Sequence, residues 1–226
     1  AMRAAGYRNA GTVEFLRDSD GSFFFMEVNA RLQVGHPVTE MVTGLDLVKV
    51  MIEIAAGRPL EIGQDDVILR GHAIECRIVA EDPARQCAPS PGRIRGLRPP
   101  AGPGVRYDDG TWPGYTVPVH YDPMIAKLIA WGRDRAEAIA RMGRALDELR
   151  IDGLTTSIPF HRKVMEHAAF AAGELHTGFL AEHPELLGVA PDPWLEEIAA
   201  IAAAVAHFRR LESRSARGRE DAPASA

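Results

Sequence analysis

The sequence predicts an α+β protein in which a β-hairpin and a helical stretch precede a β-rich unit with flanking helices. Three observations predict this fold. Asp20-Gly21 lies between two runs of strand-forming residues and favours a two-residue hairpin turn. Several short segments bounded by Gly, Pro or Asp follow within 72–131 and are typical of strands. The segment 134–149 then repeats apolar side chains at i, i+3 and i+4, as an amphipathic helix does.

The hairpin is expected to bring two acidic side chains face to face. With a type I′ turn at Asp20-Gly21, Glu14 pairs with Glu27 and Thr12 pairs with Asn29. The Cβ atoms of such pairs lie roughly 4.5–5.5 Å apart, so two carboxylates repel each other there. A divalent cation relieves that repulsion, and Mg²⁺ prefers oxygen ligands. The sequence therefore suggests a metal site on one face of the hairpin.

A polar row continues this face beyond the hairpin. Arg31 and Gln33 follow Glu27 and Asn29 at alternate positions, and a planar guanidinium offers paired donors to a planar oxyanion. The apolar run 23–26 indicates that the hairpin is largely buried. Both features favour a metal and anion site over the alternative, which is the solvated polar face of an amphipathic hairpin.

The remaining elements are expected in a regular order. Residues 38–56 are periodic in the way of a helix, with an interruption at Thr43-Gly44 and a C-terminal cap at Gly57. Polar residues at 63–66 mark the passage to a second unit. The elements expected in that unit are strands at 72–80, 92–97, 105–107, 124–131 and 154–158, and helices at 134–149, capped by Asp134, and at 160–172.

The C-terminal region is expected to form one more helix and a tail. Apolar side chains spaced by three or four residues define a narrow helical stripe. They are Trp194, Ile198, Ile201, Val205 and Phe208. The stripe suits packing on its own domain or on a partner subunit. Beyond Glu212 the Ser/Arg/Ala/Asp/Pro-rich composition predicts disorder.

Composition limits the classes of function. With 226 residues, 46% of them hydrophobic, the chain can bury a core for one or two domains. A net charge of −5 argues against nucleic acid as a partner, because such binding requires a basic face. Cys76 and Cys87 lack the spacing of a zinc site or a disulfide framework. The longest apolar run, 198–206, falls short of the ~20 residues that span a bilayer. Cytoplasmic residence is the default expectation.

Several motifs in unbroken order resemble the biotin carboxylase branch of the ATP-grasp enzymes, over about residues 6–187. They are segments 11–15, 25–34, 36–41, 70–78, 89–92, 104–106, 114–118 and 121–128. Their shared order makes the match more specific than a single motif. The resemblance implies the C-terminal part of an ATP-grasp domain at 1–62 and a β-rich biotin carboxylase C-terminal domain at 66–187. The residue pattern alone adds a helix with a disordered tail at 188–226.

The resemblance implies ATP-dependent carboxylation of carrier-bound biotin through carboxyphosphate. The implied site residues are Glu14, Glu27 and Asn29 for Mg²⁺ or Mn²⁺ and the bound ATP, Arg31, Gln33 and the backbone of Val34 for bicarbonate, and Arg106 for biotin. Arg31 and Arg106 are the implied catalytic residues, since fixed positive charge stabilises developing negative charge. The implied partners are a biotin carboxyl carrier protein or domain and a carboxyltransferase subunit, with a homodimer in the intact acyl-CoA or pyruvate carboxylase.

The sequence departs from the family pattern at Gly35, where the family carries a glutamate that acts as general base. General-base catalysis contributes ~10²–10⁴-fold, so a chain without it is expected to bind well and turn over poorly. A natural variant, an introduced substitution and a sequence error are all compatible with this glycine. His36 lies beside Pro37 and is expected to be structural rather than a substitute base.

A second departure concerns the N-terminal side of the resemblance. The family places a further domain, a glycine-rich lid and ATP-binding lysines ahead of the first matched motif, so the chain resembles the C-terminal part of a longer enzyme. On its own it is expected not to hydrolyse ATP. A non-catalytic assembly or binding module, or another ATP-grasp ligase, are the alternative interpretations.

Overall fold

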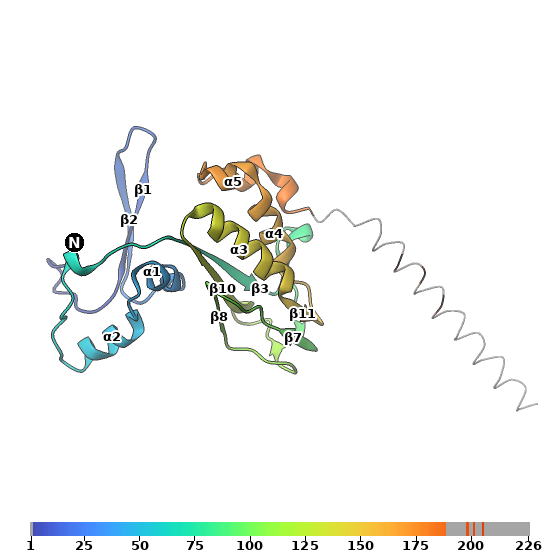
Figure 1. The fold of residues 1–226 in the computed structure, drawn as a ribbon, viewed down its shortest axis with the longest axis horizontal. Coiled ribbons are helices and arrows are strands. Elements are labelled where there is room, and N and C mark those ends of the chain that lie inside the picture. Colours follow the sequence, from blue (N-terminus) through green and yellow to red (C-terminus); the bar gives the residue numbers. More distant parts are fainter. Residues whose placement is uncertain (1, 189–197, 199–200, 202–204, 206–226) are drawn as a thin grey trace, which may run out of the picture. The chain divides into compact units, whose positions relative to one another are not determined.

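The computed structural model describes residues 2–188 together with the isolated positions 198, 201 and 205. Residues 1–188 form one compact unit, of which residues 2–188 are shown in colour in Figure 1, and the chain from 189 onward belongs to a second unit. The helix predicted at 194–208 and the tail beyond 212 lie mostly outside the described residues. Ile198, Ile201 and Val205, which belong to the predicted stripe, have helical backbone.

The N-terminal hairpin consists of β1 (Thr12–Arg17) and β2 (Phe23–Asn29). Its register pairs Glu14 with Glu27 and Thr12 with Asn29, so this part of the prediction is confirmed. The predicted two-residue turn is wrong. Asp18 N–H instead bonds to the carbonyl of Ser22, at 2.9 Å, which leaves a three-residue loop.

Two irregularities in the hairpin compensate for each other. In the three-residue loop only Gly21 adopts positive φ, at 89°, whereas a type I′ turn needs positive φ at both central residues. The longer loop shifts the register by one residue and pairs Phe15 with Phe25. A β-bulge at Met26 then restores the register at Glu14 and Glu27. The acidic pair therefore forms although the turn differs.

The expectation that the hairpin is largely buried is wrong for this chain. Phe23 is 67% exposed and Phe25 is 60% exposed. Among the described residues, β1 and β2 pack mainly on each other, and a two-stranded sheet leaves both faces open. The Phe15 ring contacts the Phe23 and Phe25 rings edge to face, at centroid distances of 6.3 and 5.9 Å.

Two short helices follow the hairpin, α1 (His36–Thr43) and α2 (Leu47–Ala55). The predicted interruption is confirmed, because Gly44 takes the left-handed conformation that ends α1. Asp46 caps α2 by accepting a hydrogen bond from Lys49 N–H at 2.9 Å. Gly57, at φ 81°, ends α2 as predicted, in a Schellman arrangement where Arg58 N–H bonds to the Glu53 carbonyl.

The second part of the unit is built on an antiparallel three-stranded sheet in the order β3 (His72–Val79), β10 (Met124–Gly132), β8 (Val105–Asp109). The other strands are β4 (Glu81–Asp82), β5 (Ala88–Pro89), β6 (Gly92–Arg93), β7 (Gly96–Arg98), β9 (Thr116–Val117) and β11 (Arg150–Asp152). The helices are α3 (Arg135–Glu148), α4 (Ile158–Glu166), α5 (Ala168–Ala172) and α6 (Phe179–Glu182), with 3₁₀ turns at Gln64–Asp66, Pro83–Arg85 and Pro184–Leu186.

One face of the three-stranded sheet is apolar and packs against α3 (Figure 1). Side chains alternate along a strand, so the positions two apart on β3 and β10 share this face. Its fully or nearly fully buried members are Ile74, Cys76, Ile78, Leu128 and Ala130 from the sheet, with Ala138, Met142, Ala145 and Leu146 from α3. The opposite face of the sheet carries charged side chains beside the buried Ile129.

Three predicted elements differ from those observed. The expected strand 92–97 is divided into β6 and β7, and no strand forms at 154–158. Instead β11 pairs with β7, and Ser157 precedes α4 as its N-terminal boundary. The expected helix 160–172 is broken at His167, whose extended backbone (φ −77°, ψ 129°) separates α4 from α5.

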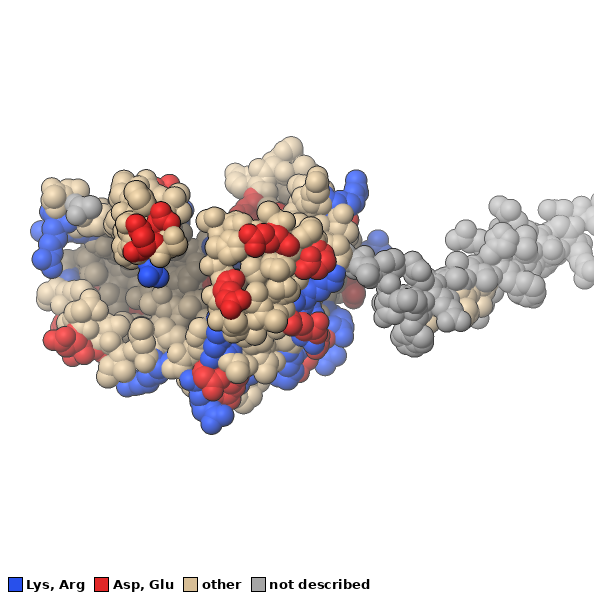
Figure 2. Space-filling view, turned by 90° about the horizontal axis from the view of Figure 1, so that it is seen from above, with Lys and Arg blue, Asp and Glu red and all other residues tan. Residues whose placement is uncertain are grey.

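The surface of the described chain mixes charges of both signs. Figure 2 shows Lys and Arg side chains interspersed with Asp and Glu side chains on the displayed face. None of the described helices is both long enough and apolar enough to cross a membrane.

The cap of α3 yields a prediction of stability. Asp134 accepts a hydrogen bond from Glu137 N–H at 2.8 Å, as expected from the sequence. Asp134→Ala should lower the free energy of unfolding by about 1 kcal/mol, because the helix loses its N-cap. Asp65→Ala, at an exposed position, is the control. Equal urea midpoints for the Asp134 variant and the parent chain would contradict this role.

Candidate functional site

The two predicted metal-binding glutamates lie on the same side of the hairpin. Asn29 Nδ2 donates to Glu14 Oε1 at 2.8 Å and to Glu27 Oε1 at 2.9 Å. Both carboxylates are therefore within hydrogen-bond distance of one nitrogen atom. Rotation of the amide would present its oxygen instead, and two carboxylates with an amide oxygen form a donor set that suits Mg²⁺.

The predicted anion-binding side chains belong to the same hydrogen-bond network. Gln33 Nε2 donates to Glu14 Oε1 at 3.0 Å. The Arg31 guanidinium donates to Asn29 Oδ1 at 3.2 Å and to Gln33 Oε1 at 3.3 Å. The structure thus brings together Glu14, Glu27, Asn29, Arg31 and Gln33.

An open groove runs beside this network. Its volume is about 600 Å³, and its lining includes Thr12, Arg31, Gln33, Gly35 and Thr39. One wall is the segment leading into β1 and the other is the start of α1. The groove therefore gives small anions access to the guanidinium of Arg31.

The backbone at Val34 connects this network to the β-rich part. The Val34 carbonyl accepts a hydrogen bond from Lys127 Nζ at 3.4 Å. His36 Nδ1 lies 2.8 Å from the Gln33 carbonyl, so its ring fixes the turn before α1, as its structural interpretation predicts. Lys127 alternates with apolar residues in the sequence, as in any half-buried strand, so its contact with this loop could not be read from β10 alone.

Arg106 lies in a different set of contacts, on the sheet. Its Nε and Nη2 atoms donate to the two carboxylate oxygens of Asp108, each at 2.8 Å. Its Nη1 donates to Glu40 Oε2 at 2.6 Å, while Glu40 Oε1 accepts from Leu47 N–H at 2.8 Å. The hydrogen bonds that Arg106 donates to Asp108, and those to Glu40, raise its pKa despite partial burial. The guanidinium is thereby held charged and fixed in orientation.

Charged residues cover the face of the sheet opposite α3. Ile129 on β10 pairs with Glu75 on β3 and with Arg106 on β8, so these three side chains share one face. The next row on that face is Arg77, Lys127 and Asp108. Lys127 Nζ lies 3.5 Å from Asp108 Oδ2 and also reaches Val34, so it bridges the Arg106 contacts and the hairpin network.

Glu75 is a buried carboxylate on β3, and its alternation with apolar neighbours in the sequence gives no sign of a functional role. Its side chain is 8% exposed, and its Oε2 atom has no hydrogen-bond partner among the described residues. Burial raises the pKa of Glu75, although the positive charges of Lys127 and Arg77 act in the opposite direction. Arg77 Nε is 3.8 Å away and its side chain is 56% exposed, so the ion pair is loose.

Gly35 lies next to Glu75 and is not required by the backbone. Its φ of −77° and ψ of 8° are open to any L residue. A Cβ atom at this position would meet nothing nearer than Glu75 Oε1, at 4.0 Å. A residue with a Cβ atom is therefore accommodated here without backbone strain.

Comparison with known proteins identifies the class. Residues 75–182 match the family model of the biotin carboxylase C-terminal domain, and residues 1–63 match that of the carbamoyl-phosphate synthase L chain, ATP binding domain. Residues 75–182 belong to the biotin carboxylase C-terminal domain family, and the chain is similar to biotin carboxylases over about four fifths of its length.

Individual relatives agree with this assignment. The chain is 55% identical to a biotin carboxylase of Nostoc sp., over 80% of this chain and 41% of the relative. It is 54% identical to biotin carboxylase 1 of Bacillus subtilis, over 80% of this chain and 40% of the relative. It thus spans about two fifths of the length of these curated relatives.

A solved structure has the same fold. The biotin carboxylase domain dimer of the Hydrogenobacter thermophilus 2-oxoglutarate carboxylase, in complex with MgADP, ADP and bicarbonate, superposes with a TM-score of 0.81. The sequence identity is 43%, and the match covers 84% of this chain and 42% of that chain.

The Arg106 to Asp108 contact yields a prediction about pH. Hydrogen bonds from Arg106 lower the pKa of Asp108 from its ordinary value of 3.8. A carboxyl with a lowered pKa in the folded state adds stability above that value, and this stability is lost as pH falls below it. Below about pH 4, the free energy of unfolding of Asp108→Asn should therefore fall less steeply with decreasing pH than that of the parent chain. Denaturation curves of Asp108→Asn and the control Asp65→Asn between about pH 5 and pH 3 test this, and identical pH profiles would contradict it.

Proposed function

We propose that this chain provides the metal-, bicarbonate- and biotin-binding part of a biotin carboxylase, an ATP-dependent ligase that carboxylates carrier-bound biotin. The observation that carries the proposal is the single network in which Asn29 joins Glu14 and Glu27 while Arg31 and Gln33 extend the same row. Family membership and the MgADP and bicarbonate held by a structural relative support it.

Glu14, Glu27 and Asn29 are proposed to hold Mg²⁺, which supplies charge neutralisation for the phosphates of ATP when bound. The two carboxylates provide the negative charge, and the hairpin register fixes their separation. Asn29 changes from donor to ligand by rotation of its amide. The role of these residues is to orient the γ-phosphate for attack by bicarbonate.

Arg31, Gln33 and the backbone at Val34 are proposed to bind bicarbonate. Arg31 offers a planar donor pair to the anion, and its present partners are neutral amide oxygens that an anion can displace. Gln33 is anchored by Glu14, so the anion is placed next to the metal ligands. Bicarbonate held close to the phosphates of ATP is positioned to form carboxyphosphate.

Arg106 is proposed to stabilise the negative charge that develops on the ureido oxygen of biotin. Its guanidinium is held by Asp108 and Glu40, so its orientation is fixed before biotin arrives. A preorganised positive charge is among the larger contributions to catalysis. Binding of biotin then requires that Arg106 share its donors with these two carboxylates.

Glu75 is proposed to serve as the acid–base group beside Gly35. Its buried carboxylate has a free oxygen atom among the described residues and lies 4.0 Å from the position of a Cβ at residue 35. A raised pKa brings a carboxylate closer to the neutral range in which general bases act efficiently. A non-catalytic binding module is the second candidate function, and the glycine at position 35, which carries no acid–base side chain, is the observation that favours it.

The proposed partners follow from the family. They are a carboxyltransferase subunit, a biotin carboxyl carrier protein or domain, and a second copy of the enzyme. The dimer of the 2-oxoglutarate carboxylase domain supports the last of these. Residence in the cytoplasm is proposed with them.

The isolated chain should show no bicarbonate-dependent ATP hydrolysis, because it spans only about two fifths of the length of its curated relatives. The N-terminal part of the Nostoc relative, supplied as a separate chain, should restore hydrolysis. Phosphate release with and without bicarbonate is the measurement. ATP hydrolysis by the isolated chain would contradict the proposal. If the mixture shows no hydrolysis with either the Gly35 chain or the Gly35→Glu variant, the result favours the binding module.

In the mixture, Gly35→Glu should raise the rate by ~10²–10⁴-fold, the usual contribution of a general base. In the mixture with the Gly35 chain, Glu75→Gln should abolish most of the ATP hydrolysis. The same substitution should have a smaller effect in the Gly35→Glu background, and a double-mutant cycle measures this difference. Glu53→Gln on α2, where the side chain is 43% exposed, is the control. Equal losses from Glu75→Gln in both backgrounds would contradict a role for Glu75 as the acid–base group.

A further inference from the structure

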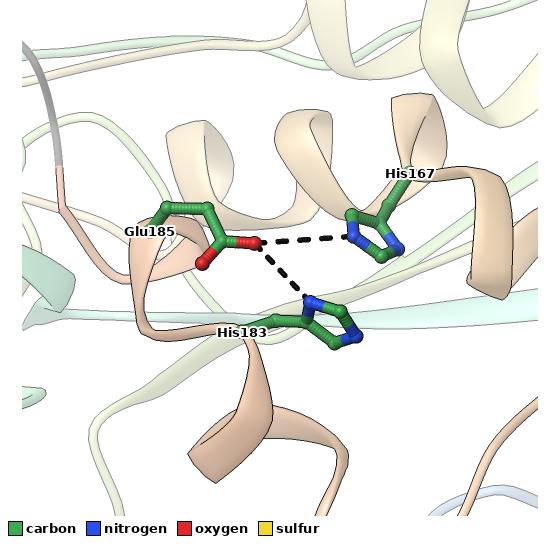
Figure 3. Close-up of side chains that lie close together, drawn as sticks. All are labelled: His167, His183 and Glu185. Atoms are coloured by element: carbon green, nitrogen blue, oxygen red, sulfur yellow. Dashed lines mark hydrogen bonds and ion pairs between the residues drawn. The ribbon is translucent and has the colours of Figure 1, made fainter.

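A cluster of metal-binding side chains lies far along the sequence from the proposed catalytic residues. His167, His183 and Glu185 each present one ligand atom, and these atoms lie within 4.8 Å of one another (Figure 3). We propose that these three residues form a site for a divalent transition-metal ion, with Zn²⁺ as its natural class of ligand. This inference is independent of the proposed function.

The distances between the three side chains are close to those of a zinc site. Glu185 Oε1 lies 3.2 Å from His183 Nδ1 and 3.9 Å from His167 Nε2. Zinc bonds to nitrogen and oxygen are about 2.0–2.2 Å long, so neighbouring ligand atoms in a tetrahedron are roughly 3.3 Å apart. The His183 and Glu185 atoms already meet this spacing, whereas His167 Nε2 must move closer to Glu185 Oε1.

The packing around the cluster holds both imidazole rings in place. Phe179 is 8% exposed and contacts the His167 ring edge to face, at a centroid distance of 5.5 Å. It also contacts the His183 ring, at 4.9 Å. The two imidazole rings are 4.3 Å apart. Since Phe179 belongs to the main core, the ligands are positioned by the fold rather than by a mobile surface.

The backbone positions of the ligands are equally well defined. His167 occupies the junction between α4 and α5, and His183 lies between α6 and the 3₁₀ turn Pro184–Leu186. Lys163 Nζ donates to the backbone carbonyl of Glu185 at 3.0 Å and so fixes that turn. Leu186, 3% exposed, anchors the turn in the core.

The composition of the cluster indicates which metal it takes. Two imidazoles and one carboxylate are the ligands that Zn²⁺ uses in sites with an open fourth position. Glu185 is 63% exposed on its side chain, so water can fill that position. Mg²⁺ prefers oxygen ligands and is not expected to bind two imidazoles. The proposed hairpin site and this cluster therefore differ in the metal that each selects.

The site would connect segments that are separate in sequence. His167 follows α4, whereas His183 and Glu185 lie shortly before Gly188, the last residue of the described unit. A metal ion at this point would cross-link the α4–α5 junction to the end of the unit. Its expected effect is structural, because metal binding to the folded state alone raises stability.

Titration of the purified chain with ZnCl₂ tests the proposal. We expect binding of one Zn²⁺ per cluster, with a rise in Tm of roughly 5–10 °C at a free metal concentration about a hundredfold above Kd, reversed by EDTA. Co²⁺ should give the visible absorption of a four-coordinate ion with nitrogen and oxygen ligands. Mg²⁺ at the same concentration should change the Tm of Glu185→Gln and of the parent chain equally, because it is not expected to bind at this cluster.

Variants distinguish this cluster from other histidines. His183→Ala and Glu185→Gln should each weaken Zn²⁺ binding at least about tenfold, because each removes one of three ligands. Glu185→Gln is at an exposed position and keeps the shape of the side chain, so it reports on the site even if the histidine variant fails to fold. His176→Ala is the matched control, since His176 is exposed and pairs with Glu182 at 3.4 Å outside the cluster.

A smaller Tm shift and a weaker Co²⁺ absorption in Glu185→Gln at the same metal concentration, with both unchanged in His176→Ala, support the site. Failure of the parent chain to bind Zn²⁺ would reduce the cluster to a His–Glu ion pair and overturn the proposal. An unchanged Kd for Zn²⁺ in Glu185→Gln, or a comparable weakening in His176→Ala, would place the metal elsewhere and overturn it as well.

Discussion

The hydrogen bonds from the Asn29 amide to Glu14 and Glu27 are the interaction on which the proposed site depends. Two carboxylates that face each other across a hairpin repel, and a donor between them makes the arrangement stable without a cation. The same amide accepts from Arg31, and Gln33 is anchored on Glu14, so the proposed metal and anion ligands share one network. A change in the register of β1 and β2 would separate them all.

The three-stranded sheet places a second set of charges beside this network. Its apolar face packs on α3, and alternation along the strands then leaves Glu75, Arg106 and Lys127 on the other face. Lys127 bridges the two sets, since it contacts both Val34 and Asp108. The fold thus brings residues from distant parts of the chain to one face, with Glu75 next to the space beside Gly35.

Sequence reasoning predicted those features that depend on local patterns. The pairing of Glu14 with Glu27, the Asp134 cap and the Gly57 cap follow from spacing and residue type. The turn was predicted wrongly because Asp-Gly suits both two- and three-residue loops. The pairing of Glu14 with Glu27 was still correct, because a bulge at Met26 offsets the longer loop. Contacts between distant segments, such as those of Glu75 and Lys127, have no local signal. The apolar composition of residues 23–26 suggested a buried hairpin, whereas these side chains are exposed in the structure. Their burial depends on which segments pack against the hairpin, and the composition of the run does not determine this.

Paramagnetic NMR with Mn²⁺ tests the central claim most directly, because Mn²⁺ takes the oxygen ligands of Mg²⁺ and broadens nearby resonances. We predict selective broadening of the Asn29 and Gln33 side-chain amide signals at low Mn²⁺ concentration, abolished by Glu14→Gln and by Glu27→Gln. Broadening of these amides that persists in both variants, or a parent chain in which neither amide broadens, would contradict the account that the facing glutamates hold the metal.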